Sequence, residues 1–398
     1  MRESLLRRTL VLVVVVGTLV LTAGPALALT TAPDMTWRVN GKGFALAQSG
    51  NTIFVGGTFG KVVSPDGTQK LDAKALAAFD MTTGAWVPTF TPSVTNTIAT
   101  GAATVRALAV SNDGSILYVG GKFDTVDGQP RQNFAAVDTA SGALIDTINV
   151  SVSNVVNAIL VGPDLVYFGG GFNRVNSKPR SRLAAIAPDG TLSTAWHPSA
   201  NDVIRSFAFA SDGNTIFIGG KYTTMNGQPR ASVSRVSPVD GTLNPWAIPA
   251  GVIDAGNPAW DLLATPTRLY GGFGNGPNYL ASFRLDNGST GSQVWRTNFV
   301  GNVQALSMHP NGTRLFVGGH FGTAVLQQTA CGIPLRGLVM VDPANGAIDC
   351  SWIPQIEPHG SNYTAAWTLL GTPTQLWVAG FFTSISGVTQ QGFARYTL

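Results

Sequence analysis

The sequence predicts an all-β protein made of repeats of one structural unit, and three observations lead to this prediction. The 398 residues are 44% hydrophobic and 12% charged, so the chain can bury a large core and lacks the composition of a disordered segment. Glycine occurs 47 times without a collagen period, beside short runs of valine, isoleucine, threonine and phenylalanine. Copies of residues 115–144 recur along nearly the whole chain, and each copy has the pattern of strands joined by tight turns.

The most regular copy of the unit predicts four strands, at residues 105–110, 116–123, 134–138 and 143–150. Its second strand contains a pair of glycines near its end, and this pair identifies the other copies. The pairs are Gly56-Gly57, Gly120-Gly121, Gly169-Gly170, Gly219-Gly220, Gly271-Gly272 and Gly318-Gly319, with Ala379-Gly380 as a degenerate copy. They are 47 to 64 residues apart. A period of about 50 residues with four short strands is typical of a β-propeller blade, so we expect a seven-bladed β-propeller of four-stranded antiparallel blades.

The two ends of the chain predict how this ring of blades closes. The last unit has strands near residues 365–370, 375–382 and 393–398 but no fourth strand. Residues 35–40 resemble the fourth strand at 294–298 and are likewise followed by a first strand. We therefore expect the N-terminal strand to pair into the last blade, along residues 393–398, which covers a sheet edge.

Side chains that recur from unit to unit are expected to have structural roles. Aspartates follow the third strands, where a carboxylate accepts hydrogen bonds from the turn backbone. They are Asp80, Asp138 and Asp342. Tryptophans precede prolines in the fourth strands and are expected to pack one blade on the next. They are Trp196, Trp246 and Trp352.

Three arginines, Arg131, Arg180 and Arg230, each follow a proline at the same place in successive units. One interpretation makes them a basic arc for an anionic ligand. The other makes each of them an anchor for its own loop, through hydrogen bonds to local carbonyl groups, and the regular recurrence favours this second interpretation.

The repeat pattern resembles a known family. A glycine pair is followed by an aromatic residue such as Phe59 or Phe123, then by a third strand ending in Val-Asp or Phe-Asp, a Thr-Gly or Ser-Gly turn and a Trp-x-Pro segment. This pattern resembles the bacterial delta-60 repeat propellers, and it is similar to kelch blades in its glycine pair and later tryptophan. The resemblance covers residues 35–398 and implies an exported or cell-surface propeller. It implies no single activity, because kelch propellers include both scaffolds and oxidases.

Residues 1–28 predict a secretory signal peptide, which leaves residues 29–398 as a single propeller domain. Arg2, Arg7 and Arg8 precede an apolar run at 10–21, and Ala26 and Ala28 are small residues suited to cleavage. The run is shorter than the roughly 20 residues that span a bilayer, so no membrane span is expected in the mature chain. We expect a secreted or cell-surface protein.

Charge and cysteine content limit the partners and the chemistry that we expect. Removing residues 1–28, which hold three basic residues and one acidic residue, lowers the net charge from +4 to +2. The remaining basic residues are spread along the repeats, so no nucleic-acid partner is predicted. Cys331 and Cys350 are the only cysteines, and in an exported protein such a pair predicts a disulfide. No three of the four histidines are expected to converge, so we predict no metal site and no cofactor, and we expect a monomer.

Departures from the regular unit indicate where a ligand site lies. Units one and six have the longest connections between second and third strands, and long connections also follow their fourth strands. Antiparallel order places all of these on one face, and ring closure makes units six, seven and one neighbours. This long-loop sector offers a ligand-binding set without a recognised motif. The set is Lys61, Asp66, Lys70, His359, Asn362 and Tyr363.

We therefore expect an exported binding module whose ligand is an extracellular glycan, an envelope component or a protein. The competing prediction is a secreted hydrolase, lyase or oxidase with its site on the same face, although no catalytic residue is predicted and no esterase, zinc-protease or phosphate-loop motif occurs. Converging carboxylates would favour the enzyme, and an aromatic-lined groove would favour the binding module.

Overall fold

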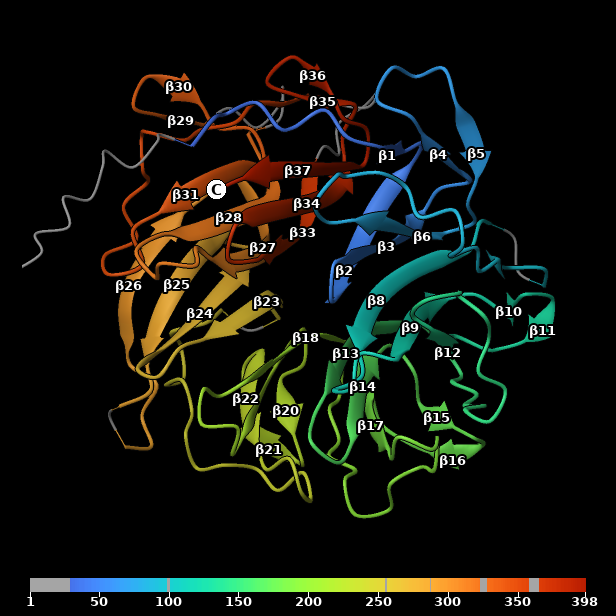
Figure 1. The fold of residues 1–398 in the computed structure, drawn as a ribbon. Coiled ribbons are helices and arrows are strands. Elements are labelled where there is room, and N and C mark those ends of the chain that lie inside the picture. The colour runs from blue at the N-terminus through green and yellow to red at the C-terminus, as the bar shows by residue number, and fades with distance from the viewer. Residues whose placement is uncertain (1–28, 99–100, 255, 287, 323–327, 358–364) are drawn as a thin grey trace, which may run out of the picture.

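The computed structural model describes residues 29–98, 101–254, 256–286, 288–322, 328–357 and 365–398, so the predicted signal peptide lies outside the described residues. Within these ranges every regular element is a β-strand, which confirms the predicted all-β class. The strands form antiparallel sheets arranged around a common centre (Figure 1). Across the described part of the chain, no helix is long and apolar enough to cross a membrane.

The main sheets follow one another along the chain, and each is built from strands that are consecutive within one repeat. In chain order they are β2 (Lys42–Ser49), β3 (Thr52–Thr58) and β6 (Leu76–Asp80); β8 (Thr104–Val110), β9 (Ile116–Lys122) and β12 (Phe134–Asp138); β13 (Val156–Val161), β14 (Val166–Gly170) and β17 (Leu183–Ile186); β18 (Ile204–Phe209), β19 (Ile216–Gly220) and β22 (Val233–Val236); β23 (Ala259–Ala264), β24 (Arg268–Phe273), β25 (Tyr279–Arg284) and β26 (Gln293–Asn298); β27 (Gly301–Met308), β28 (Leu315–Phe321) and β31 (Leu338–Val341); and β33 (Ala365–Gly371), β34 (Gln375–Phe381) and β37 (Phe393–Thr397).

The first strand of each main sheet lies nearest the centre (Figure 1). Each first strand packs against the first strand of the next sheet, from β2 through β8, β13, β18, β23 and β27 to β33, and β33 also packs against β2. The inner strands therefore surround a central space, which the side chains of these strands line.

The prediction of a regular fourth strand is wrong for most units. Among the described residues only the sheet with β26 has a fourth strand, whereas elsewhere the fourth segment makes a single bridge, such as Val137 with Leu144. The segment then turns, with the Ile148 amide donating to the Ile145 carbonyl at 3.2 Å. This turn directs an apolar side chain into the core, at Ile148 here and at Trp196 in the next unit. Burial of that side chain stabilises the segment in place of the hydrogen bonds that a full fourth strand would form.

Loops between second and third strands fold into small hairpins at the outer edge, several of which pair with the segment arriving from the preceding sheet. Asp127 illustrates how a hairpin holds the preceding segment. Its backbone is left-handed (φ 50°), its amide donates to the Ser93 carbonyl, and its carboxylate accepts from the Ser93 amide. These outer strands are β1 (Arg38–Val39), β4 (Lys61–Val63), β5 (Lys70–Asp72), β7 (Val94–Thr95), β10 (Thr125–Val126), β11 (Gln129–Pro130), β15 (Arg174–Val175), β16 (Lys178–Pro179), β20 (Thr224–Met225), β21 (Gln228–Pro229), β29 (Thr329–Ala330), β30 (Ile333–Pro334), β32 (Ile356–Glu357), β35 (Ser384–Ile385) and β36 (Val388–Thr389).

The recurring glycine pair faces a β-bulge in the first strand. In the second sheet Val105 pairs with Gly121 and Ala107 pairs with Gly120, which leaves Arg106 as the extra residue. A Cβ atom on Gly121 would lie 2.0 Å from the Thr104 carbonyl oxygen, and one on Gly120 would lie 2.6 Å from Val156 of the next sheet. The second glycine thus leaves room for the bulged backbone of the first strand, and the first glycine leaves room for a side chain of the neighbouring sheet.

The core is divided among clusters that join neighbouring sheets. One cluster contains Phe54 of the first sheet and Leu117 of the second, and another contains Phe79 of the first sheet with Trp377 and Phe393 of the last. The tryptophans join sheets as predicted, because the indole of Trp196 donates to the Ser237 carbonyl of the next sheet at 3.0 Å.

The predicted turn and loop anchors are also present. The carboxylate of Asp138 accepts from the Ser141 amide at 2.8 Å, and those of Asp80 and Asp342 accept from amides of their own turns. Arg131, Arg180 and Arg230 each donate to the carbonyl of the preceding proline, which confirms the anchoring interpretation. Cys331 and Cys350 form a disulfide with Cα atoms 5.9 Å apart.

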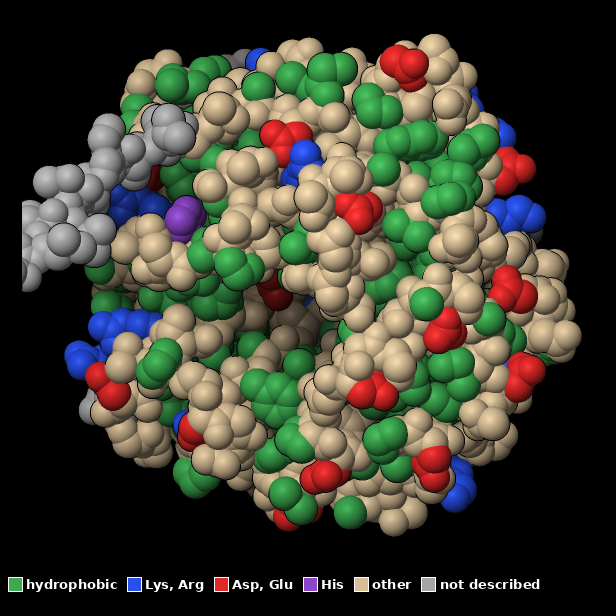
Figure 2. All heavy atoms as spheres, viewed as in Figure 1, with side chains coloured by type: hydrophobic (Ala, Val, Ile, Leu, Met, Phe, Trp, Pro, Cys, Tyr) green, Lys and Arg blue, Asp and Glu red, His purple; other side chains and the backbone are tan. Residues whose placement is uncertain are grey.

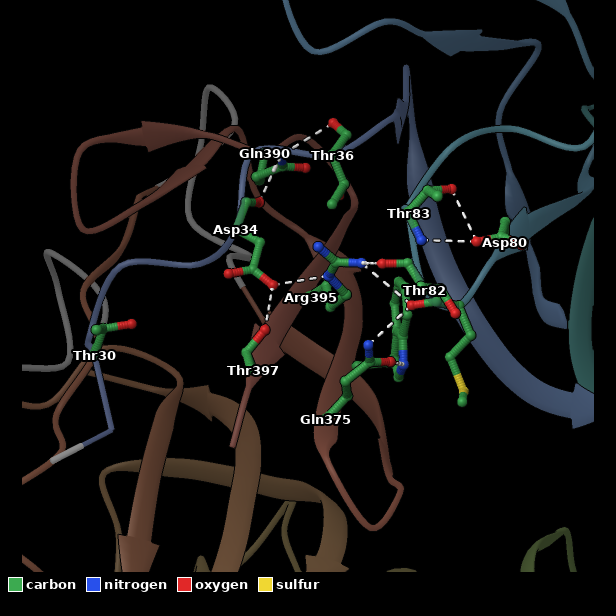
Figure 3. A network of polar contacts seen from close by, with 12 residues as sticks. Thr30, Asp34, Thr36, Asp80, Thr82, Thr83, Gln375, Gln390, Arg395 and Thr397 are labelled. Atoms are coloured by element: carbon green, nitrogen blue, oxygen red, sulfur yellow. Dashed lines mark hydrogen bonds and ion pairs between the residues drawn. The ribbon is translucent and has the colours of Figure 1, made fainter. Parts of the chain in front are cut away.

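The N-terminal segment meets the last main sheet through a polar network (Figure 3). Asp34 forms a bridge with Arg395 of β37, its carboxylate accepts from the Arg395 Nε at 2.7 Å, and Gln390 donates to the carbonyls of Asp34 and Thr36. The prediction of a ladder between residues 35–40 and 393–398 is wrong, because β1 pairs with β4 instead. After Asp34 the chain bends away from β37 and joins the outer β4–β5 hairpin, as the segments after several other third strands join the outer hairpins of the following sheets.

The Arg395→Gln variant is expected to lower the free energy of unfolding by about 1–3 kcal/mol, because it leaves the partly buried Asp34 carboxylate without its cation. The Arg395 side chain is only 13% exposed and also donates to the Thr82 carbonyl. The matched control is Arg284→Gln, which removes an exposed pair with Asp286 and should cost less than about 1 kcal/mol. Urea denaturation measures both, and equal losses would contradict the stabilising role of the Asp34–Arg395 pair.

Candidate functional site

The bulges of the first strands place one side chain from each main sheet at the centre. We call these residues the bulge ring. They are Phe44, Arg106, Asn157, Arg205, Trp260, Gln304 and Trp367. Because a bulge leaves its extra residue outside the ladder, that side chain is free to turn toward the central space.

All members of the bulge ring line one central cavity of about 240 Å³. Figure 2 shows the molecule hollowed at its centre, with hydrophobic side chains beside the opening. Pockets for drug-sized ligands measure about 300–1,000 Å³, so this cavity suits a sugar residue or an end group of a larger molecule.

One side of the cavity is aromatic. Trp367 lies between Phe44 and Trp260, with edge-to-face ring centroids 5.5 Å and 6.2 Å away. The indole nitrogens of Trp260 and Trp367 are shielded and have no hydrogen-bond partner among the described residues. Aromatic side chains in a cavity wall suit a ligand that has an apolar edge.

The other side of the cavity is polar and cationic, and comes from the consecutive strands β8, β13 and β18. Arg106 and Arg205 flank Asn157 there, and Asn157 donates to the Ile204 carbonyl at 3.0 Å. The surrounding protein desolvates both guanidinium groups and lowers the pKa of each. For Arg205 the pKa falls to about 10, and the nearby charge of Arg106 adds to the effect.

The arginines stack on the aromatic side chains at the border between the two sides. The guanidinium carbon of Arg205 lies 3.7 Å from the ring centroid of Trp260, and that of Arg106 lies 5.3 Å from that of Phe44. Stacking uses the flat face of a guanidinium and leaves its in-plane N–H donors pointing away from the ring.

Asp261, the residue after Trp260, is the one carboxylate among the residues that line this cavity. Burial raises its pKa to about 7, opposed by hydrogen bonds from the amides of Leu306 and Leu262 at 2.9 Å each. The corresponding positions in β8 and β18 are Ala107 and Ser206. Asp261 therefore makes the β23 side of the cavity chemically distinct.

A second cavity of about 380 Å³ adjoins the first, since Trp260, Gln304 and Trp367 line both. Its other lining residues come from the β24–β25 loop, the start of β27 and the end of β28. They are Asn275, Gly276, Asn278, Gly301, Asn302 and His320. These segments belong to the face that carries the long loops, so the two cavities together lead from that face toward the centre.

The described residues of the predicted ligand-binding set lie elsewhere. Lys61 pairs with Asp72 at 2.6 Å, and Lys70 begins the exposed strand β5. Asp66 accepts from the Ser64 hydroxyl and from the Thr68 amide, which lowers the pKa of its carboxyl group. These three side chains belong to the outer β4–β5 hairpin, and none of them lines either cavity.

The remaining members of the set, His359, Asn362 and Tyr363, lie outside the described residues. Within the described ranges, no group of three His, Cys, Asp or Glu side chains is placed to hold a metal ion.

The bulge ring is absent from the predicted site residues, although the sequence contains a signal for it. Each member except Trp260, which is followed by Asp261, stands between small or β-branched residues, as in Val105-Arg106-Ala107 and Val303-Gln304-Ala305. At this position the residue type changes from repeat to repeat, while its neighbours stay similar. A strict strand alternation hides the signal, because the bulge shifts the register by one residue.

The Asp261→Asn variant is expected to change how stability depends on pH. An unfolded aspartate titrates near pH 4, so between about pH 4 and 7 the folded state holds a proton that the unfolded state has lost, and wild-type stability falls as pH rises through this window. Asparagine removes this dependence, so the stability difference between wild type and variant should change by about 3–4 kcal/mol between pH 4 and 8. Denaturation across this range tests it, with the exposed Asp164→Asn as control. A difference that is constant with pH would contradict the buried titration.

Comparison with known proteins places the fold in a wide group. No protein-family model matches the sequence, and no curated protein sequence matches it. Among solved structures, the WD40 β-propeller domain of Doa1 superposes with a TM-score of 0.55 and 12% identity, over 92% of this chain and 96% of that one. An extracellular domain, that of BT4673 from B. thetaiotaomicron, gives a TM-score of 0.55 and 13% identity, over 92% of this chain and 39% of that one. The computationally designed protein Ika8 gives 0.50 and 14%, over 92% and 100%. At these identities the similarity concerns the fold alone, and that fold is a β-propeller.

Proposed function

We propose that this protein is an exported binding module that takes an extracellular ligand at the centre of its propeller. One observation carries the proposal: every first strand contributes its bulge residue to the same cavity. The cavity opens toward the face that bears the long loops, which suits a ligand presented by a larger molecule such as a cell-envelope polymer.

A glycan is the ligand class that fits this cavity best. Phe44, Trp260 and Trp367 offer ring faces that pack against the C–H groups of a sugar, while Asn157 and Gln304 offer amide groups to its hydroxyls. The buried oxygen of Gln304 has no hydrogen-bond partner among the described residues. A protein partner remains the alternative ligand for the outer loops.

A secreted enzyme is the second candidate function, and Asp261 is the observation that favours it. A carboxyl group with a pKa of about 7 beside a cavity can exchange a proton near neutral pH. Both of its oxygens already accept backbone hydrogen bonds, and it is the one carboxylate lining the cavity. Hydrolysis of a glycosidic bond ordinarily uses two carboxyl groups, so binding is the better supported function.

We propose further that the chain forms seven blades and that the N-terminal segment closes the ring. The amide of Asp34 donates to the Arg395 carbonyl in the same way as the amides of Val87 and Ile145 donate to Ala78 and Ala136 of their own third strands. Asp34 and Trp37 have the spacing of Asp349 and Trp352 in the preceding unit. These parallels, with the core cluster between the first and last sheets, support closure.

The family and the location of the protein are part of the same proposal. The glycine pairs facing the bulges, the aspartate turns and the buried tryptophans are the features by which the sequence resembles delta-60 repeat propellers. A disulfide between Cys331 and Cys350 is compatible with an oxidising, extracellular environment, as the predicted signal peptide requires.

Binding is tested with the mature protein on an array of bacterial and plant glycans, with and without chelator. The expected result is a defined set of glycans whose affinity falls about tenfold or more in Trp260→Ala and Trp367→Ala, because each variant removes a ring face from the cavity. Trp86→Ala is the matched control, since Trp86 packs on Trp37 away from the cavity and should leave binding unchanged. An array without bound glycans, or binding that is insensitive to the cavity variants, would contradict the proposal.

Ring closure is tested by deleting residues 29–37 from the mature chain. The deletion removes Asp34 and exposes the edge of β37, so we expect a loss of more than about 3 kcal/mol in unfolding free energy or failure to fold. A truncated protein as stable as the full mature chain would show that the segment closes nothing.

A further inference from the structure

We propose that the group bound in the central cavity is an anion, a carboxylate or sulfate carried by an acidic saccharide, and that Arg106 and Arg205 hold it. This inference rests on the proposed glycan-binding function and names the chemistry of its ligand. Three observations carry it: the free donors of the two arginines, their placement on one side of the cavity, and the balance of charge around them.

Within the described ranges, neither cavity arginine has a carboxylate partner of the kind that Arg131 and Arg395 have. Arg131 donates to Asp146 at 2.7 Å and Arg395 donates to Asp34 at 2.7 Å, so each of these has a carboxylate partner. Among the described residues, Arg106 and Arg205 form no ion pair, and the Nε of Arg205 has no hydrogen-bond partner, as is also true of the Nε of Arg131. A guanidinium held inside a cavity with unused donors is suited to an anion, which it binds with paired N–H groups.

The two guanidinium groups are fixed in place before a ligand arrives. Arg205 stacks on Trp260 and Arg106 stacks on Phe44, so each flat face is held and the in-plane donors are left for the cavity. Asn157 stands on the strand between them and its amide is fixed by the Ile204 carbonyl. Preorganised donors cost little side-chain entropy when a ligand binds.

The charge around the cavity favours an anion as well. Asp202, the acid nearest to Arg205 in sequence, pairs with Lys221 at 3.7 Å, and its charge raises the pKa of Arg205 less than burial and the charge of Arg106 lower it. Asp261 already accepts two backbone hydrogen bonds, so its oxygens are committed to the protein. The charge of Arg106 contributes to the lowered pKa of Arg205, so the two guanidinium groups repel each other in the free protein and an anion between them relieves that repulsion.

The aromatic side of the cavity explains why the anion should be carried by a sugar. Trp260 and Trp367 line the same cavity as Arg106, with their ring centroids 6.2 Å apart. A carboxylate or sulfate on a sugar ring would meet the arginines while the ring itself packs on an indole. A free inorganic anion would use only the first of these two contacts.

The test measures tryptophan fluorescence and thermal stability of the mature protein during titration with sodium glucuronate, glucose or sodium sulfate, each at constant ionic strength set with sodium chloride. We expect glucuronate to bind at least about tenfold more tightly than glucose, because a charge-assisted hydrogen bond contributes more than a neutral one. Arg106→Gln and Arg205→Gln should each weaken glucuronate about 10- to 100-fold. Arg174→Gln, an exposed arginine bonded to the Ser177 carbonyl outside the cavity, is the control and should bind as wild type.

The outcomes separate the two proposals. Equal binding of glucose and glucuronate that is lost in Trp260→Ala but unchanged in the arginine variants would overturn the anion inference and keep the glycan site. Sulfate binding that depends on both arginines, without binding of either sugar, would keep the anion site and overturn the glycan proposal. No response to any of the three probes would overturn both. Folding of the arginine variants is checked by their unfolding transition without ligand.

Discussion

The close approach of two backbones at each glycine pair is the constraint on which the rest of the structure depends. The first strand must bulge opposite the pair, and the bulged carbonyl then comes so near the second strand that a Cβ atom has no room there, as at Gly121. The same lack of a side chain lets the next sheet insert Val156 against Gly120. One short motif therefore sets the bulge within a sheet and the packing between sheets.

The fifth main sheet shows that the bulge is maintained even where the motif slips. In β24 the residue opposite Ala259 is Phe273, and Gly272 takes the place that the first glycine has elsewhere. Its missing Cβ again makes room for a valine of the next sheet, Val303. In this sheet the position facing the next sheet is thus held by glycine, while the position opposite the start of the bulge holds the larger Phe273.

A repeated bulge separates scaffold from function in this molecule. The backbone around each bulge is nearly the same, but its extra residue is a tryptophan in β23, an arginine in β18 and an asparagine in β13. Because these residues face the cavity rather than a packed interface, they can vary without disturbing the core. The result is a cavity with an aromatic side and a cationic side, built on strands that are otherwise alike.

The sequence by itself determined the β class, the repeating unit and the roles of its recurring residues, because short-range chemistry fixes them. Alternation defines strands such as β12, a carboxylate such as that of Asp138 fixes its own turn, and Arg180 anchors its own loop. The fourth strands were overestimated, because burial of Trp196 and Ile148 competes with an outer ladder and only packing decides between them. The partner of the N-terminal strand was predicted wrongly for a similar reason, because tertiary packing pairs β1 with β4 rather than with β37. The cavity could be decided only by tertiary structure, because Arg106 and Trp260 come from distant strands and meet only when each bulge turns its extra side chain toward the same centre.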